Sequence, residues 1–220
     1  MKFTALLPIK FESQRVPNKN FKKLNGKELF KWILEKLISI DEVNQIIINT
    51  DAVKKVSLKL GKKIDKKVLI KQRIKKLIGH KTPMNKIIEN DLFDCRNENI
   101  IMTHATNPLL TKKFILLCIK KYKNSIKESY DSLFTLDKFY GRFYDFNLNP
   151  LNHKVNQLIQ TQDLKPIFFE NSNLYIFSKT SFKKNNNRIG IRPNFMISPK
   201  TISLDIDDKE DWKLAEKLIK

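Results

Sequence analysis

The chain has 220 residues, of which 41% are hydrophobic, and it carries a formal net charge of +20 at pH 7. This length and hydrophobic content suit one α/β domain over residues 1–220 and exclude a disordered chain. The longest apolar run, residues 114–119, is too short to span a membrane, and no signal-peptide pattern follows Met1. We therefore expect a cytoplasmic protein without a membrane partner, in which Cys95 and Cys118 are reduced, buried thiols.

The high positive charge has two explanations, an anionic partner such as nucleic acid or a membrane, or a composition rich in lysine along the whole chain. Lysines are spread along polar helix faces, and the sequence contains no arginine-rich tract, zinc-finger spacing or aromatic–basic RNA motif. We therefore expect no dedicated nucleic-acid partner, although a basic nucleic-acid-binding module stays an alternative. The same charge would steer small anionic substrates toward the protein.

Strands and helices alternate along the first half of the chain. Short apolar runs rich in β-branched residues predict strands at 3–7, 45–49, 67–71 and 99–103. Apolar residues at helical spacing, or a preceding capping residue, predict helices at 28–40, 52–60, 83–93 and 112–123. This alternation predicts a doubly wound, mostly parallel sheet.

The pattern changes in the second half. Strands are predicted at 132–136 and 173–177, followed by a short helix at 178–184 and a final helix at 210–219. Between the two strands, residues from about 138 to 165 are rich in aromatic residues and asparagine and show no helical period. We interpret this segment as an extended excursion from the main sheet.

A basic loop follows the first predicted strand. It carries Lys10, Arg15 and Lys19 within ten residues. A strand that leads into a cationic loop at the edge of a sheet is a usual way to bind a polyphosphate. No Gly-x4-Gly-Lys-Ser/Thr motif occurs in the sequence, so a nucleotide would be bound by a scheme other than a P-loop.

Two aspartates near the C-terminus form a candidate metal site. Asp205 and Asp207 alternate with Leu204 and Ile206, and in a strand both carboxylates would lie on one face, about 7 Å apart. Such a pair can bind one Mg²⁺ ion, which takes one or two carboxylates together with phosphate oxygens. The alternative is a strand end followed by an aspartate helix cap, which explains Asp207 but not Asp205.

Polar residues also follow the other predicted strands. Asp51 follows the strand at 45–49, and we interpret it as the cap of the helix at 52–60. Arg73 and His104 follow the next two strands, at the edge where α/β sheets bind ligands. His104 has no partner at metal-ligand spacing, so we expect no metal there.

Together these residues resemble the acylneuraminate cytidylyltransferase family, whose members activate acidic nine-carbon sugars as CMP conjugates. The resemblance runs in the family's order from about residue 3 to residue 219. It is carried by Ser13-Gln-Arg-Val-Pro17-Asn-Lys19-Asn20, Leu24-Asn-Gly26-Lys, Ile48-Asn-Thr50-Asp51, Thr106-Asn-Pro108-Leu-Leu-Thr111 and Asp205-Ile-Asp207. Two further segments, Thr161-Gln-Asp163-Leu and Glu170-Asn171-Ser…Tyr175-Ile-Phe, resemble one branch of the family.

The resemblance implies a Rossmann-like, three-layer nucleotidyltransferase that transfers a cytidylyl group from CTP to a nonulosonic sugar acid and releases pyrophosphate. It implies catalytic roles for Lys10, Lys19, Asp205 and Asp207, the two aspartates binding Mg²⁺. It assigns nucleotide binding to Lys10, Ser13, Arg15, Lys19, Asn20 and Arg73, and sugar binding to His104, Thr106, Gln162 and Tyr175. Family members are often homodimers in which the excursion reaches the neighbour's sugar site, so we expect a homodimer.

Four positions depart from the residues usual in the family. Lys10 stands where an arginine is usual, which keeps the charge but loses the bidentate fork. His104 stands where a glutamine is common, and Leu110 and Thr161 stand where arginines are common. The alternatives are another sugar nucleotidyltransferase, a glycosyltransferase that uses Asp205-Ile-Asp207 as its metal motif, or a catalytically inactive homologue.

Overall fold

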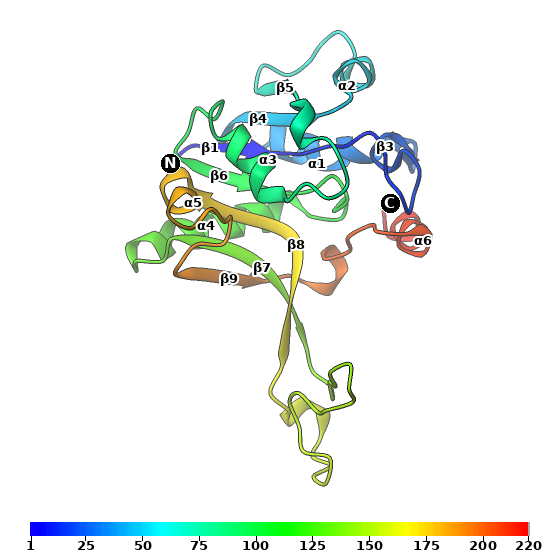
Figure 1. The fold of residues 1–220 in the computed structure, drawn as a ribbon, viewed down its shortest axis with the longest axis vertical. Helices are drawn as coiled ribbons and strands as arrows, with labels where there is room; N and C mark the ends of the chain where they lie inside the picture. The colour runs from blue at the N-terminus through cyan, green and yellow to red at the C-terminus, as the bar shows by residue number, and fades with distance from the viewer. Residues whose placement is uncertain (220) are drawn as a thin grey trace.

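A seven-stranded sheet lies at the centre of the computed structural model, which describes residues 1–219 (Figure 1). The strand order is β5-β4-β1-β6-β8-β7-β9. β8 is antiparallel to β6 and β7, and the other neighbouring pairs are parallel. The strands are β1 (Phe3–Leu6), β4 (Val43–Thr50), β5 (Val68–Gln72), β6 (Asn99–Met102), β7 (Ser132–Phe139), β8 (Ile167–Ser178) and β9 (Pro193–Ile197). A small separate hairpin pairs β2 (Lys23–Leu24) with β3 (Lys27–Glu28).

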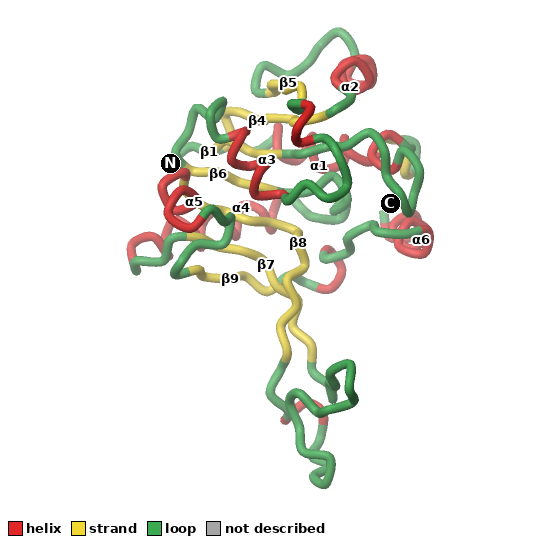
Figure 2. The backbone as a smooth tube through the Cα atoms, in the orientation of Figure 1, coloured by secondary structure: helices red, strands yellow, loops and turns green. Residues whose placement is uncertain are grey.

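Helices lie on both faces of this sheet, as Figure 2 shows. The α-helices are α1 (Leu29–Ile38), α2 (Val53–Leu60), α3 (Met84–Asp91), α4 (Lys112–Lys127), α5 (Lys179–Asn185) and α6 (Lys209–Leu218). Short 3₁₀ helices are η1 (Lys19–Phe21), η2 (Lys75–Leu77), η3 (Thr161–Asp163) and η4 (Lys200–Ile202). Within residues 1–219, no helix combines the length and the apolar character needed to cross a membrane.

The two faces of the sheet build two separate cores, because successive residues of a strand point to opposite sides. Ala5 of β1 packs in a cluster with residues of α1 and α4, among them Phe30 and Ile115. Leu6, the next residue of β1, packs in a second cluster with Ile88 of α3. Burial on both faces explains the apolar run at residues 46–48 of β4 and the apolar residues of β1.

A third, smaller core joins the two ends of the chain. Val16 of the basic loop packs in one buried cluster with Ile206 and with Trp212 of α6. This contact brings the segment that contains Asp205 and Asp207 next to the loop that follows β1.

A long arm extends from the sheet. β7 and β8 continue together beyond the other strands as a two-stranded ribbon, and residues 140–166 form its tip (Figure 1). The tip exposes large apolar side chains, since Phe146 is 100% and Leu158 84% accessible to solvent. The arm corresponds to the predicted excursion, although β7 and β8 are both longer than expected.

The structure confirms the predicted Rossmann-like, mostly parallel α/β fold, with both cysteines free and buried. One strand was missed, and two local predictions are wrong. β9 was not predicted, and it is a half-buried edge strand without a clear apolar pattern. Residues 203–207 form no strand, because they are held by single contacts such as Ile206 N–H to Thr106 O at 2.9 Å. Asp51 does not cap α2; its Oδ1 accepts the N–H of Phe11 at 2.7 Å.

Candidate active site

The basic loop after β1 is fixed to the edge of the sheet. Ile9 continues the pairing with β4 by donating its N–H to Asn49 O at 2.9 Å. The chain then turns outward through Lys10, and Asn20 closes the loop by donating Nδ2–H to Lys10 O at 2.9 Å. The loop therefore forms a wall of defined shape at the carboxyl ends of β1 and β4.

Arg73, directly after β5, is anchored beneath this loop. Its Nε donates to Asn49 Oδ1 at 2.7 Å, and its Nη2 donates to the backbone oxygens of Ile9 and Asn49 at 3.3 and 3.0 Å. Asn49 in turn donates Nδ2–H to Asp91 Oδ1 at 2.6 Å. Arg73 is 5% exposed, and burial lowers its pKa. Because buried polar groups need partners, this network fixes the guanidinium at the base of the site.

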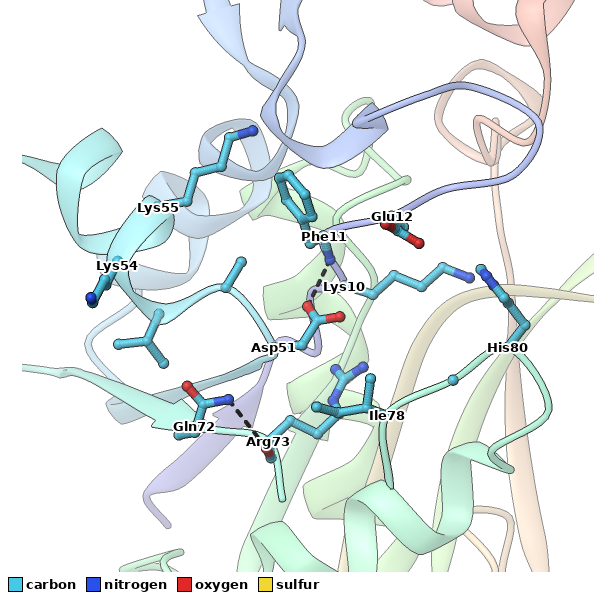
Figure 3. A pocket seen from close by; sticks show the side chains of 13 residues that line it. Lys10, Phe11, Glu12, Asp51, Lys54, Lys55, Gln72, Arg73, Ile78 and His80 are labelled. Carbon is cyan, nitrogen blue, oxygen red and sulfur yellow. Dashed lines mark hydrogen bonds between the residues drawn. The ribbon is translucent and has the colours of Figure 1, made fainter. Parts of the chain in front are cut away.

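A cavity of about 660 Å³ opens between the basic loop, α2 and the end of β5 (Figure 3). Lys10 and Arg73 line it from the loop and from β5, and Asp51 lies between them. The neighbouring Ser13 has a buried hydroxyl with no hydrogen-bond partner within residues 1–219. A cavity of this size lined by cations, with an unpaired hydroxyl nearby, suits a polar, anionic ligand such as a nucleotide.

A second cavity, of about 300 Å³, connects the nucleotide-side residues with the predicted sugar-side residues. Lys10, Asn20 and Arg73 line one part of it, and His104 and Thr106 line the other. The structure therefore brings together residues from the loops after β1, β5 and β6, as the resemblance implied.

The aspartates lie beside the cations of the basic loop. Arg15 Nη2 is 2.6 Å and Lys19 Nζ 3.7 Å from Asp207 Oδ1, and Lys19 also donates to Ile206 O. Burial lowers the pKa of Lys19, and the charges of Asp207 and Asp205 act in the opposite direction. The Arg15 and Lys19 side chains thus both contact the Asp207 carboxylate, which comes from the far end of the chain.

Asp205 and Asp207 both line a third cavity, of about 520 Å³. Asp205 Oδ1 is buried and has no hydrogen-bond partner within residues 1–219, and burial raises the pKa of this carboxyl group. The described residues contain no group of three histidine, cysteine or acidic side chains that could enclose a metal. Mg²⁺ needs only one or two carboxylates when substrate phosphates complete its shell, so the pair fits this ion.

The predicted sugar-binding residues do not all lie at the same cavity. His104 is half-buried beside the second cavity; burial, followed by the charges of Arg188 and Lys19, lowers its pKa to about 3. Tyr175 is buried in β8 and its hydroxyl is bonded within the protein. Gln162 lies in η3 of the arm, where it bonds Gln160 at 2.8 Å, so one chain alone does not bring it to the cavities.

Sequence reasoning missed the residues that hold Arg73. Asn49 lies in Ile48-Asn-Thr50-Asp51, one of the segments that resemble the family, but nothing at the end of an apolar strand indicated that its side chain would bind Arg73. Asp91 lies in α3 and is 1% exposed, with Lys71 Nζ 3.2 Å from its carboxylate. An acidic residue on an amphipathic helix carries no signal of burial until the tertiary structure is known. Leu110, at a position of departure, is a fully buried core residue.

The mostly parallel sheet, the basic loop after β1 and the facing aspartate pair define a nucleotidyltransferase of the α/β class. A family model described as "Cytidylyltransferase" matches residues 4–219, and the chain belongs to this family.

Curated relatives have low identity to this chain, and it covers nearly the whole length of two of them and half the length of a third. The chain is 24% identical over 219 residues to post-translational flagellin modification protein B of Campylobacter coli, covering 94% of this chain and 91% of the relative. It is 23% identical over 233 residues to a pseudaminic acid cytidylyltransferase of Campylobacter jejuni, covering 100% and 97%. It is 24% identical to N-acylneuraminate cytidylyltransferase A of Danio rerio, covering 98% of this chain and 50% of that protein.

Solved structures agree on the fold. A CMP:2-keto-3-deoxy-manno-octonic acid synthetase complexed with CTP superposes with a TM-score of 0.65 at 10% identity, covering 99% of this chain and 98% of the other. A 4-diphosphocytidyl-2C-methyl-D-erythritol synthase from Anaerococcus prevotii gives a TM-score of 0.68 at 11% identity, covering 98% and 95%. At such identities the likeness extends to the fold alone.

Proposed function

We propose that this chain transfers the cytidylyl group of CTP to a nonulosonic, sialic-acid-like sugar acid and releases pyrophosphate. One observation carries the proposal: Lys19 and Arg15 of the basic loop meet Asp207, which lines a cavity together with Asp205. Cations and carboxylates on one edge suit a triphosphate and a divalent ion. Membership of the cytidylyltransferase family and the sugar-acid substrates named for two relatives support the same substrates.

In the proposed reaction, the anomeric hydroxyl of the sugar attacks the α-phosphorus of CTP, the new P–O bond forms, and pyrophosphate leaves. Negative charge rises on the phosphate oxygens, so positioned cations are the main catalytic means. Lys10 and Lys19 hold the phosphates from the basic loop, and Arg73 and Ser13 orient the nucleotide. Asp205 and Asp207 would hold Mg²⁺, which when bound neutralises phosphate charge.

Nucleotide selectivity tests the first half of this proposal. Thermal unfolding would be followed with CTP, UTP, GTP and ATP, each with and without Mg²⁺. We expect stabilisation by CTP that increases with Mg²⁺, because a ligand that binds only the folded state raises its stability. Equal shifts with all four nucleotides, or none, would count against a cytidylyl donor site.

We further propose that the arm makes the protein a homodimer. Its tip exposes a set of large apolar side chains on an extended ribbon, which a second copy could cover: Tyr140, Phe146, Leu148, Leu151, Leu158 and Ile159. Large exposed apolar patches are typical of interaction sites. In such a dimer Gln162 would reach the partner's cavity.

A further inference from the structure

Arg188 is a cation near the candidate active site. It neither lines the nucleotide cavity nor contacts the aspartate pair, so the proposed function gives it no role. It lies in the loop between α5 and β9, and its side chain is 17% exposed. Its guanidinium carbon lies 3.7 Å from the centroid of the Tyr175 ring, and its Nη2 donates to the Tyr175 hydroxyl at 2.8 Å. Tyr175 therefore holds this guanidinium in place from two directions.

The loop that carries Arg188 is also fixed. Asp131 Oδ2 accepts the N–H of Ile191 at 2.8 Å, and its Oδ1 accepts the N–H of Arg192 at 3.1 Å. The Asp131 carboxylate lies so close to Gly190 that a Cβ there would come within 2.0 Å of it. The backbone next to Arg188 is thus shaped around the Asp131 carboxylate, which holds the loop at residues 190–192.

Part of the guanidinium is left for a ligand. Within residues 1–219, Nη1 makes one recorded contact, with the weak acceptor Met102 Sδ at 3.9 Å. Nη2 also lies 3.3 Å from Glu170 Oε1, which accepts a second hydrogen bond from the Tyr175 hydroxyl. The Glu170 side chain is 41% exposed, so water competes for its contact with Arg188. An incoming anion could take Nη1 and displace Glu170 from Nη2.

The position of Arg188 relates it to the sugar side of the site. Met102 ends β6, two residues before His104, and His104 lines the cavity shared with Thr106. The charge of Arg188 contributes to the low pKa of His104, as does that of Lys19. His104 is therefore close enough to both Arg188 and Lys19 to be affected by their charges.

We propose that Arg188 binds the carboxylate of the acidic sugar and so determines the preference for sugar acids, with Tyr175 as its positioning residue. The inference rests on the proposed function, in which the acceptor's carboxylate adjoins the attacking hydroxyl and lies near the anionic phosphates and aspartates. A carboxylate there requires a cation, and a guanidinium is suited to bidentate binding. The donors of Arg188 that lack strong partners fit this requirement.

The test compares Arg188→Gln with a matched control, Arg192→Gln, from the same loop. Arg192 is exposed, and its guanidinium carbon lies 5.3 Å from the ring centroid of Tyr130. Steady-state pyrophosphate release would be measured with a nonulosonic acid and with its methyl ester. We expect Arg188→Gln to raise KM for the acid about 30-fold or more, in the range for losing a charge-assisted contact, and to abolish the preference for acid over ester. The control should keep both.

Two further measurements distinguish failure of this inference from failure of the proposed function. CTP-induced thermal stabilisation should be the same in wild type and Arg188→Gln, which shows a folded nucleotide site, and Arg188→Lys should recover part of the preference for the acid. Active wild type beside an Arg188→Gln enzyme with unchanged KM and acid preference would overturn this inference alone. Wild type that binds CTP but uses no sugar acid would overturn the proposed function, and this inference with it.

Discussion

The anchoring of Arg73 by Asn49 gives a prediction that can be worked out from the structure. Asn49→Ala removes the bond from Arg73 Nε at 2.7 Å and the bond to Asp91 Oδ1 at 2.6 Å. Both bonds involve charged groups, and each is worth about 1.5–3 kcal/mol. Arg73 keeps its two bonds to backbone oxygens, so we place the total loss of unfolding free energy at about 3–5 kcal/mol.

This loss should appear in urea unfolding, and the freed guanidinium should weaken CTP binding by about tenfold or more in calorimetry, since one tenfold step is about 1.4 kcal/mol. Asp91→Asn is the matched control, because an amide oxygen can still accept the bond from Asn49. It should keep CTP affinity close to that of wild type. If Asn49→Ala binds CTP as wild type does, Arg73 is not a nucleotide-positioning residue, and this reasoning is refuted.

Two other predictions concern stability and assembly. Burial raises the pKa of Glu28, but bonds from Lys31, its own backbone and Lys59 outweigh it and lower the pKa to about 2, from the usual 4.5. Glu28→Gln should therefore cost about 3 kcal/mol of stability above pH 4.5, at 1.36 kcal/mol per pKa unit. This difference should disappear as pH falls from 4.5 toward 2, because the wild-type carboxylate is then protonated; a pH-independent difference in urea unfolding would contradict it. For assembly, we predict that the wild type sediments as the proposed homodimer and that Phe146→Ser with Leu158→Ser sediments as a monomer; an unchanged mass would exclude the arm tip as the interface.

Most of the architecture could be predicted because burial on both sheet faces leaves a strong pattern. The apolar runs of β1 and β4 and the helix cap of Thr111, whose Oγ1 accepts from Phe114 N–H, are local signals. The edge strand β9 is only half-buried, so its sequence carries a weak signal. Asp51 was misassigned because a residue before a helix is often its cap, whereas here the basic loop bonds the carboxylate.

The sequence predicted those site residues that lie in short motifs occurring in the family's order. It did not predict which residues from distant parts of the chain would contact one another. The basic loop and Asp205-Ile-Asp207 were found from the sequence, but the ion pair between Arg15 and Asp207 spans 192 positions. Arg188 likewise has no role that the sequence could indicate, because its neighbours Tyr175 and Met102 lie in β8 and β6.

Cytidylyl transfer itself is tested most directly by turnover. Purified protein would be incubated with CTP, Mg²⁺ and, separately, sialic, legionaminic and pseudaminic acids, and pyrophosphate and CMP-sugar would be measured together. Asp207→Ala and the exposed control Glu128→Ala would run in parallel; the Asp207 side chain is 47% exposed, so its removal should leave the fold intact. We predict equal amounts of both products with at least one acid in wild type and in Glu128→Ala, and no turnover in Asp207→Ala. Folded wild type that forms no product with any of the acids, or full activity in Asp207→Ala, would contradict the account.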